Sequence, residues 1–365
     1  MGIHWYILSA LFVILAQRYL FRYFGMRGVG YTRNFSVETC FEGDRIEMVE
    51  RLANRKFVPV PWLRVESLLH TGLKFESDSN FAVSSGDIYQ NHRSLFSLMG
   101  NKQLTRRHSV LATTRGCYRL TSASLTFGDL FGMFSSWRSV PLNVELLVYP
   151  QPADRSLIQL PSRSWQGDIT VRRWIVEDPF YISGVREYRP GDSFRSVNWS
   201  ATARTGSLQV HRRDFTADYR LIVLLNVEDH AGMWEVVNNP ELIEEGIRYA
   251  AAIMQYATEQ GMETAFACNG HELDQPGEIM KVERGSGSEH LHHLYGKLAK
   301  LVIARALPFD AMIEQLSAEW EERCDIVLIS AFMSEPIERE MAKLRSAGHS
   351  VDWLRIAGAE EVAAG

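Results

Sequence analysis

The sequence predicts a multidomain protein made of an N-terminal membrane anchor, an antiparallel β-sandwich-like domain and a doubly wound α/β domain. Three observations predict this order: an uncharged apolar run near the N-terminus, short alternating segments up to Pro150, and strand-like segments separated by helix-like ones after Tyr219. A chain of 365 residues, 46% of them hydrophobic, has apolar material for two or three domains. We expect the anchor in residues 1–28, the β domain in 31–150, a connecting segment with a motif in 151–215, and the α/β domain in 216–360.

The predicted anchor begins with twelve residues that carry no charge, Trp5 to Ala16. Because a bilayer-spanning helix needs about twenty residues, the span is long enough only if Arg18 and Arg22 extend their side chains to the interface. Arginines follow the apolar run and no acid occurs in the first 33 residues. The positive-inside rule therefore predicts a cytoplasmic-membrane protein with its bulk on the cytoplasmic side.

Two alternatives remain for this N-terminal segment. A cleaved signal peptide fits less well, because no Lys or Arg precedes the apolar run and no small-residue cleavage site follows it. An amphipathic or buried N-terminal helix is the other alternative.

The β domain is predicted from alternation of apolar and polar residues. Segments such as DRIEMVERL, WLRVESLL, CYRLTSASLTF and NVELLVYP alternate with a period of two and are separated by Gly, Asn, Pro and Asp. This pattern indicates antiparallel strands with one face toward water.

The α/β domain is predicted from a change of pattern after Tyr219. RLIVLLNV has the length of a buried strand, and residues 240–260 show helical spacing with Pro240 near the start and Gly261 just after the end. Strand-like ETAFAC, CDIVLIS and HSVDWLRI then alternate with helix-like segments, which predicts a mostly parallel sheet.

Charge divides the chain in two and limits the class of partner. From Asp214 onward there are 27 acidic against 12 basic residues, a net charge of −15, within a whole-chain charge of −5. We expect no nucleic-acid partner for this acidic half, because such a partner needs a basic groove. The four cysteines lie far apart and form no CxxC pair, which is typical of buried thiols.

The segment from Gly184 to Arg213 holds six arginines, no lysine and two acids. RPGD at residues 189–192 predicts a turn, after which Asp192 is placed to cap a short helix. Clustered arginines beside acids favour a structural role. We expect Trp199 to pack inward and the segment to join the two domains. In the alternative interpretation the arginines receive an acidic partner or a phosphate.

This segment also resembles the hallmark of bacterial domain-of-unknown-function family 58 (DUF58), with the pattern R-E-Y-x-x-G-D-x-x-R-x-V-N-W-x-x-x-A-R. The likeness extends to the N-terminal hydrophobic segment, the β-rich region ending in Val148-Tyr149-Pro150, and a C-terminal domain that resembles von Willebrand factor A. The matching motif residues are Arg186, Glu187, Tyr188, Gly191, Asp192, Arg195, Val197, Asn198, Trp199, Ala203 and Arg204.

The resemblance implies a membrane-attached protein that works with a MoxR-type AAA+ ATPase in assembling or maturing a protein client. It supplies no catalytic residues. We therefore expect a non-enzymatic interaction protein without a cofactor. The alternatives are an enzyme of unknown reaction whose site lies between Arg186 and Arg204, and a Mg-dependent ligand-binding module.

The metal site of a von Willebrand A-like domain is expected after the first strand of that domain, where hard oxygen ligands hold Mg²⁺. Here Asn226, Glu228 and His230 stand in place of the aspartate and the two serines, and Ala331 follows a later strand where an acid is expected. The sequence predicts a degenerate site without metal that keeps the sheet edge as a docking surface.

Histidines and common catalytic motifs point to no further site. HLHHLYGKLAKL predicts a partly exposed amphipathic helix rather than a metal site, because no cysteine or carboxylate pair completes a ligand set. No GxSxG, HExxH or GxxxxGK[ST] sequence occurs in the chain.

Overall fold

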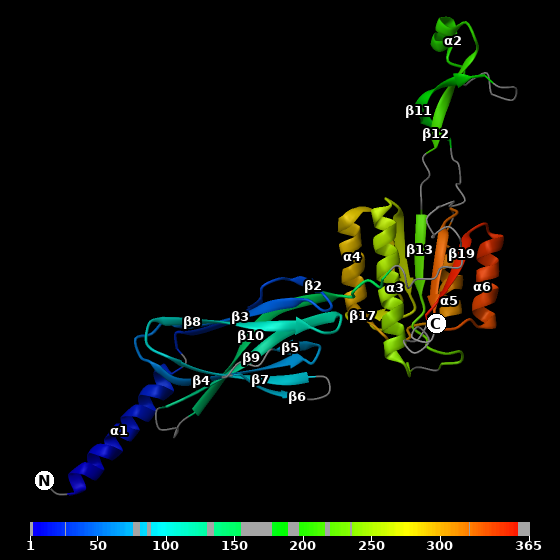
Figure 1. Ribbon diagram of the computed structural model, residues 1–365. Coiled ribbons are helices and arrows are strands. Elements are labelled where there is room, and N and C mark those ends of the chain that lie inside the picture. The colour runs from blue at the N-terminus through cyan, green and yellow to red at the C-terminus, as the bar shows by residue number, and fades with distance from the viewer. Residues whose placement is uncertain are drawn as a thin grey trace.

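A computed structural model describes residues 3–25, 27–75, 81–85, 89–129, 135–154, 177–188, 197–215, 220–233, 236–320 and 322–356. The chain begins with helix α1 (Ile3–Phe24), continues through a β region, and ends in a region of mixed helices and strands (Figure 1). A hairpin with a short helix lies apart from both regions in the same view.

The β region consists of two facing sheets. The smaller sheet has the order β1 (Val29–Phe35), β3 (Arg45–Asn54), β8 (Lys102–Ala112), β5 (Leu73–Phe75). The larger has the order β2 (Thr39–Phe41), β10 (Ser135–Tyr149), β9 (Gly116–Gly128), β4 (Val60–His70), β7 (Tyr89–Leu98), β6 (Phe81–Ser85).

Alternating burial places one face of each sheet in a shared core. On β3 every second residue from Ile46 to Asn54 is buried, as period-two side chains require. Leu52 from the smaller sheet joins Leu63, Phe96 and Leu125 from the larger one in a single apolar cluster. Pairing is antiparallel except that β2 runs parallel to β10.

The C-terminal region is built on a five-stranded sheet. Its order is β16 (Met280–Gly285), β14 (Glu263–Cys268), β13 (Arg220–Leu225), β18 (Asp325–Ser330), β19 (Ser350–Arg355). Helices α3 (Pro240–Glu259) and α4 (Gly287–Lys300) contribute to one core cluster, and α5 (Phe309–Ser317) and α6 (Glu335–Ser346) to another. The two pairs lie on opposite sides of the sheet in Figure 1. A two-stranded sheet, β15 (His271–Glu272) with β17 (Leu301–Val302), lies beside it.

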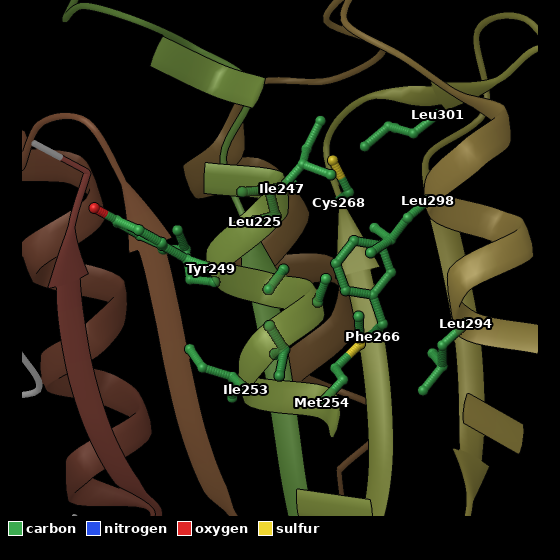
Figure 2. Packing of buried hydrophobic residues seen from close by; sticks show 14 of the residues in the cluster. Leu225, Ile247, Tyr249, Ile253, Met254, Phe266, Cys268, Leu294, Leu298 and Leu301 are labelled. Atoms are coloured by element: carbon green, nitrogen blue, oxygen red, sulfur yellow. The ribbon is translucent and has the colours of Figure 1, made fainter. Parts of the chain in front are cut away.

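Helix α3 illustrates how the sequence sets these elements. Asn239 caps it by accepting a hydrogen bond from the Leu242 amide, and Pro240 occupies the first turn, where no intrahelical donor is needed. The apolar stripe of the helix then packs against Leu225 and Phe266 of the sheet and Leu298 of α4 (Figure 2). Burial of this stripe stabilises the helix far more than propensity alone.

The fold class predicted from the sequence is wrong in its anchor. Among the residues that the structure describes, no helix is long and apolar enough to cross a membrane. The physical reason lies in α1, where Gln17 and Arg18 end the apolar run from Trp5 to Ala16. That run of twelve residues spans only about 18 Å, against a hydrocarbon thickness of about 30 Å.

The doubly wound, von Willebrand factor A-like fold predicted for the C-terminal region is also not what is observed. After β14 the chain passes through the short strand β15 and returns as β16, which pairs antiparallel with β14, so no crossover helix separates these two strands of the sheet. The sequence MKVERG of β16 was missed as a strand. The chain as a whole is rich in β structure divided among several sheets.

Candidate functional site

The carboxyl ends of three parallel strands bring polar side chains together at one edge of the C-terminal sheet. Asn226 follows β13, Asn269 follows β14, and Ser330 ends β18, and all three are buried. The side-chain Nδ2 of Asn226 donates to Ser330 Oγ at 3.0 Å, and its Oδ1 accepts from Asn269 Nδ2 at 3.0 Å and from the backbone amide of Glu228 at 3.0 Å. Both polar atoms of the Asn226 side chain are therefore engaged within the protein.

The other residues of the predicted degenerate metal position point elsewhere. Glu228 lies 3.5 Å from the guanidinium of Arg305, and burial raises the pKa of its carboxyl although Arg305 opposes that shift. His230 contacts the neighbouring Asp229. Within the described ranges, no group of three or more His, Cys, Asp or Glu residues is arranged to hold a metal.

Asp229 holds the loop between β13 and α3 through hydrogen bonds to backbone amides. Its Oδ2 accepts hydrogen bonds from the amides of Asn238 at 2.6 Å and Asn239 at 2.7 Å. Burial would raise the pKa of this carboxyl, but the Asn239 amide and His230 outweigh burial and lower it. The carboxylate thus fixes the two residues that precede α3, and the second of them, Asn239, caps the helix.

The motif segment forms a hairpin, β11 (Glu177–Glu187) with β12 (Gln209–Phe215), that carries helix α2 (Trp199–Thr205). Asn198 caps α2, accepting from the Ala201 amide at 2.9 Å, so the predicted cap Asp192 is not the residue at this helix start. Gly206 ends the helix with φ of 73°, a conformation that favours glycine. Buried Val197 bridges to buried Val210 and fixes the helix against the hairpin.

Trp199 does not pack inward, so that prediction is wrong. Its side chain is 66% exposed at the first position of α2, and the large apolar residues Val185 on β11 and Leu208, just before β12, are exposed too. Cap formation explains this placement, because Asn198 rather than Trp199 turns its side chain onto the helix start.

Of the remaining motif residues, those that the structure describes are dispersed along the hairpin. Arg186 and Glu187 are the last two residues of β11, and the Tyr188 amide donates to the Leu208 carbonyl at 2.9 Å. Arg204 is exposed in the last turn of α2. Gly191, Asp192 and Arg195 lie outside the described residues.

Residues outside the motif join the β region to the C-terminal region. Arg115, which precedes β9, donates to both carboxylate oxygens of Glu244 on α3 at 2.6 and 3.0 Å, and to the carbonyl oxygens of Leu298 at 2.6 Å and Leu301 at 2.9 Å. Arg119 on β9 forms a second bidentate pair with Asp274 at 2.6 Å.

Aromatic packing completes this junction. Tyr149 at the end of β10 belongs to the same core cluster as α3 and α4, and its ring centre lies 5.7 Å from that of Tyr295. Phe41 of β2 contacts both rings edge-on. The predicted role of the motif as the link between the regions therefore belongs to Arg115, Arg119 and this aromatic group. The signal that could have found it is the arginine pair beside Tyr118, at the start of a long strand.

A polar cluster lies inside the β region, between the two sheets. The guanidinium of Arg33 donates to Glu50 and Ser67, Tyr31 OH donates to Glu50 Oε1 at 2.8 Å, and His108 Nε2 lies 3.1 Å from Glu50 Oε2. This cluster was not predicted from the sequence. Alternation could have revealed it, because each residue occupies an inward position of its strand.

Burial and pairing shift the ionisation of this cluster in opposite directions. Burial alone would raise the pKa of Glu50, but the hydrogen bond from His108 and the charge of Arg33 lower it to about 2. On β7 nearby, burial together with Arg33 lowers the pKa of His92 to about 3. Glu50 is thus ionised and His92 neutral at neutral pH.

Comparison with known proteins supports the family resemblance. The model of the family described as "Protein of unknown function DUF58" matches residues 184–363, a range that contains the motif hairpin and the five-stranded sheet. A relative from Bacillus subtilis (strain 168), "Uncharacterized protein YeaD", is 20% identical over 335 residues, covering 91% of this chain and 78% of the relative. These matches do not identify a von Willebrand factor A-like domain.

Solved structures resemble about a third of the chain. A non-cellulosomal cohesin from Archaeoglobus fulgidus is 14% identical and matches 34% of this chain and 94% of its own, with a TM-score of 0.23. A cohesin module from Clostridium perfringens is 10% identical and matches 31% of this chain and 97% of its own, with a TM-score of 0.20. At these scores the likeness carries no conclusion.

Proposed function

We propose that this chain is a non-enzymatic interaction protein attached to the cytoplasmic face of a membrane. The proposal starts from the match of residues 184–363 to the DUF58 family model. Its docking element is the β11–β12 hairpin with α2, and its partner is a MoxR-type AAA+ ATPase that acts on a protein client. The observation that carries the proposal is the exposure of Trp199 on this hairpin.

The construction of the hairpin supports a docking role. The cap at Asn198, the turn at Gly206 and the Val197–Val210 contact hold α2 in place without using the indole ring. Tryptophan and arginine are the residues that most often dominate the binding energy of protein interfaces, and α2 presents Trp199 and Arg204 within six residues. A rigid element with a free aromatic ring loses little entropy on binding.

Attachment to the membrane is proposed through α1. Apolar and aromatic side chains are exposed around this helix, among them Trp5, Phe12 and Leu15. Burial of such surface in lipid is favourable by roughly 25 cal/mol for each square ångström removed from water. Arg18, near the end of the same helix, suits an anionic headgroup layer.

The hairpin proposal is tested by recovery of the ATPase from detergent-solubilised cells with the tagged full chain. We expect the wild-type chain and Trp137→Ala to recover the ATPase, and Trp199→Ala to lose it. Trp137 is a matched control because its side chain is 72% exposed on β10 and lies outside the family match.

Two results would overturn parts of the proposal. If the wild-type chain recovers no AAA+ ATPase, the partner is wrong. If Trp199→Ala recovers as much ATPase as Trp137→Ala does, the hairpin is not the docking element.

A further inference from the structure

The larger sheet of the β region contains a gap between two neighbouring strands. β4 pairs with β9 only from Trp62 opposite Gly128 to Glu66 opposite Ser124. Beyond Glu66, β4 continues to His70 in register with β7 alone. In the part of the chain that the structure describes, residues 116–123 of β9 therefore pair with a strand on one side only, through β10.

This unpaired edge of β9 carries the hydrogen-bonding groups of an open sheet. In a strand, alternate residues direct their N–H and C=O groups to opposite sides. Half of the backbone groups between Gly116 and Ala123 thus face away from β10 with no strand to receive them. An exposed row of this kind is a template for pairing with another extended segment.

A cavity occupies the same place. It has a volume of about 560 Å³ and is lined by the end of β4, the start of β9, and residues 299–303 of the C-terminal region. Three large apolar side chains on its lining, Leu68, Tyr89 and Leu273, are exposed to solvent. The cavity therefore offers apolar contacts beside a free backbone edge.

The charges around the cavity are already paired within the protein. Arg115 is bound to Glu244, Arg119 to Asp274 and Glu145, and Lys300 lies 3.7 Å from Glu145. Three positive charges thus face three negative ones, so the site balances its own charge. An occupant that complements it is uncharged.

We infer that the gap between β4 and β9 binds an extended, uncharged segment of another polypeptide, which adds a strand to β9 at residues 116–123. Main-chain hydrogen bonds to β9 supply affinity, and alternate apolar side chains of the segment cover Leu68, Tyr89 and Leu273. This site is separate from the hairpin and requires no ATPase.

The position of the cavity gives this binding a structural consequence. Its lining includes residues from both main regions, and Arg115 fixes them together through Glu244 and the carbonyl of Leu301. A bound strand would contact both regions at once and stabilise their junction.

The inference is tested with the purified full chain in detergent and a fluorescein-labelled, acetylated and amidated heptapeptide of alternating Thr and Val. Fluorescence anisotropy should report saturable binding. A second peptide with the same sequence, methylated on alternate backbone amides, should bind about ten-fold more weakly or worse, because it cannot donate the ladder hydrogen bonds. Hydrogen exchange should slow at residues 117–123 when the first peptide is added.

Two matched variants locate the site. Leu68→Arg places a charge in the lining and should weaken binding about ten-fold or more. Leu95→Arg is the control, because Leu95 is 56% exposed on β7 and does not line the cavity, whereas Leu68 is 65% exposed. Equal binding by the two peptides, equal binding by the two variants, or unchanged exchange at 117–123 would each overturn the inference.

Discussion

The β region and the motif hairpin depart from ordinary burial in opposite directions. The β region buries an arginine, a glutamate and two histidines between its sheets, whereas the hairpin exposes a tryptophan and two aliphatic side chains. Buried charge persists only when it is paired, and here Arg33 and His108 both bind Glu50. Exposed apolar surface needs no internal partner and is available to an external one. The contrast separates residues that hold the fold from residues that remain available for binding.

The largest expected effect is the loss of the buried glutamate. Glu50→Ala leaves Arg33 charged and unpaired in the core, which should lower the free energy of unfolding by about 3–5 kcal/mol. Denaturant titration measures the change. Glu47→Ala is the matched control on the same strand, since Glu47 pairs with Arg107 at the surface and should cost at most about 1 kcal/mol. Similar losses in both variants would contradict a stabilising role for the cluster.

Mutations at the junction between the two main regions should destabilise the protein, as mutations in the β core do and Trp199→Ala on the hairpin does not. Arg115→Ala removes a nearly buried guanidinium that binds Glu244 and two backbone carbonyls, so we expect a loss of about 2–4 kcal/mol. Arg119→Ala should cost no more than about 1 kcal/mol, because its ion pairs are about half exposed. Calorimetry should show the two main regions unfolding separately in Arg115→Ala. A single transition at the wild-type temperature would argue against this role.

Acid should weaken the β region in a defined window. The pKa of His92 is about 3 in the folded chain against 6.5 ordinarily, so the unfolded chain takes up this proton first as pH falls. The stability linked to His92 is complete above pH 6.5 and declines as the pH falls toward 3. Glu50, with a pKa of about 2 against 4.5, adds a further loss below pH 4.5. His92→Gln should flatten the slope of unfolding free energy between pH 6.5 and 4.5, and an unchanged slope would contradict this assignment.

The smallest expected effect on stability belongs to the hairpin. Trp199→Ala should change the free energy of unfolding by no more than about 0.5 kcal/mol, because the ring is mostly exposed and the cap at Asn198 remains. Val197→Ala should cost more, since Val197 is buried against Val210. Hydrogen exchange of β12 amides compares the two variants. A larger loss for Trp199→Ala than for Val197→Ala would show that the ring packs.

The sequence predicted local elements better than their assembly. Pro240 and the apolar stripe of α3 marked a helix because both signals are local. β16 was missed because MKVERG is short and polar, and pairing with β14 rather than propensity places it in the sheet. The predicted anchor failed on length, since Gln17 and Arg18 end the apolar run after the twelve residues from Trp5 to Ala16.

The candidate sites depended even more on contacts between distant residues. The motif pattern resembled the family whose model matches residues 184–363, but only the structure put Asn198 at the helix cap and Trp199 at the surface. Arg33 and Glu50 are 17 residues apart and meet because β1 pairs with β3. The gap beside β9 depends on where β4 leaves its neighbour, which no local pattern records.

The most direct test of the docking role of Trp199 is the affinity of the purified chain for a purified MoxR-type AAA+ ATPase, measured by biolayer interferometry. We predict that Trp199→Ala raises the dissociation constant about ten-fold or more, as loss of an interface tryptophan does, while Trp137→Ala leaves it unchanged. Equal dissociation constants for the two variants, with both chains folded, would contradict the account.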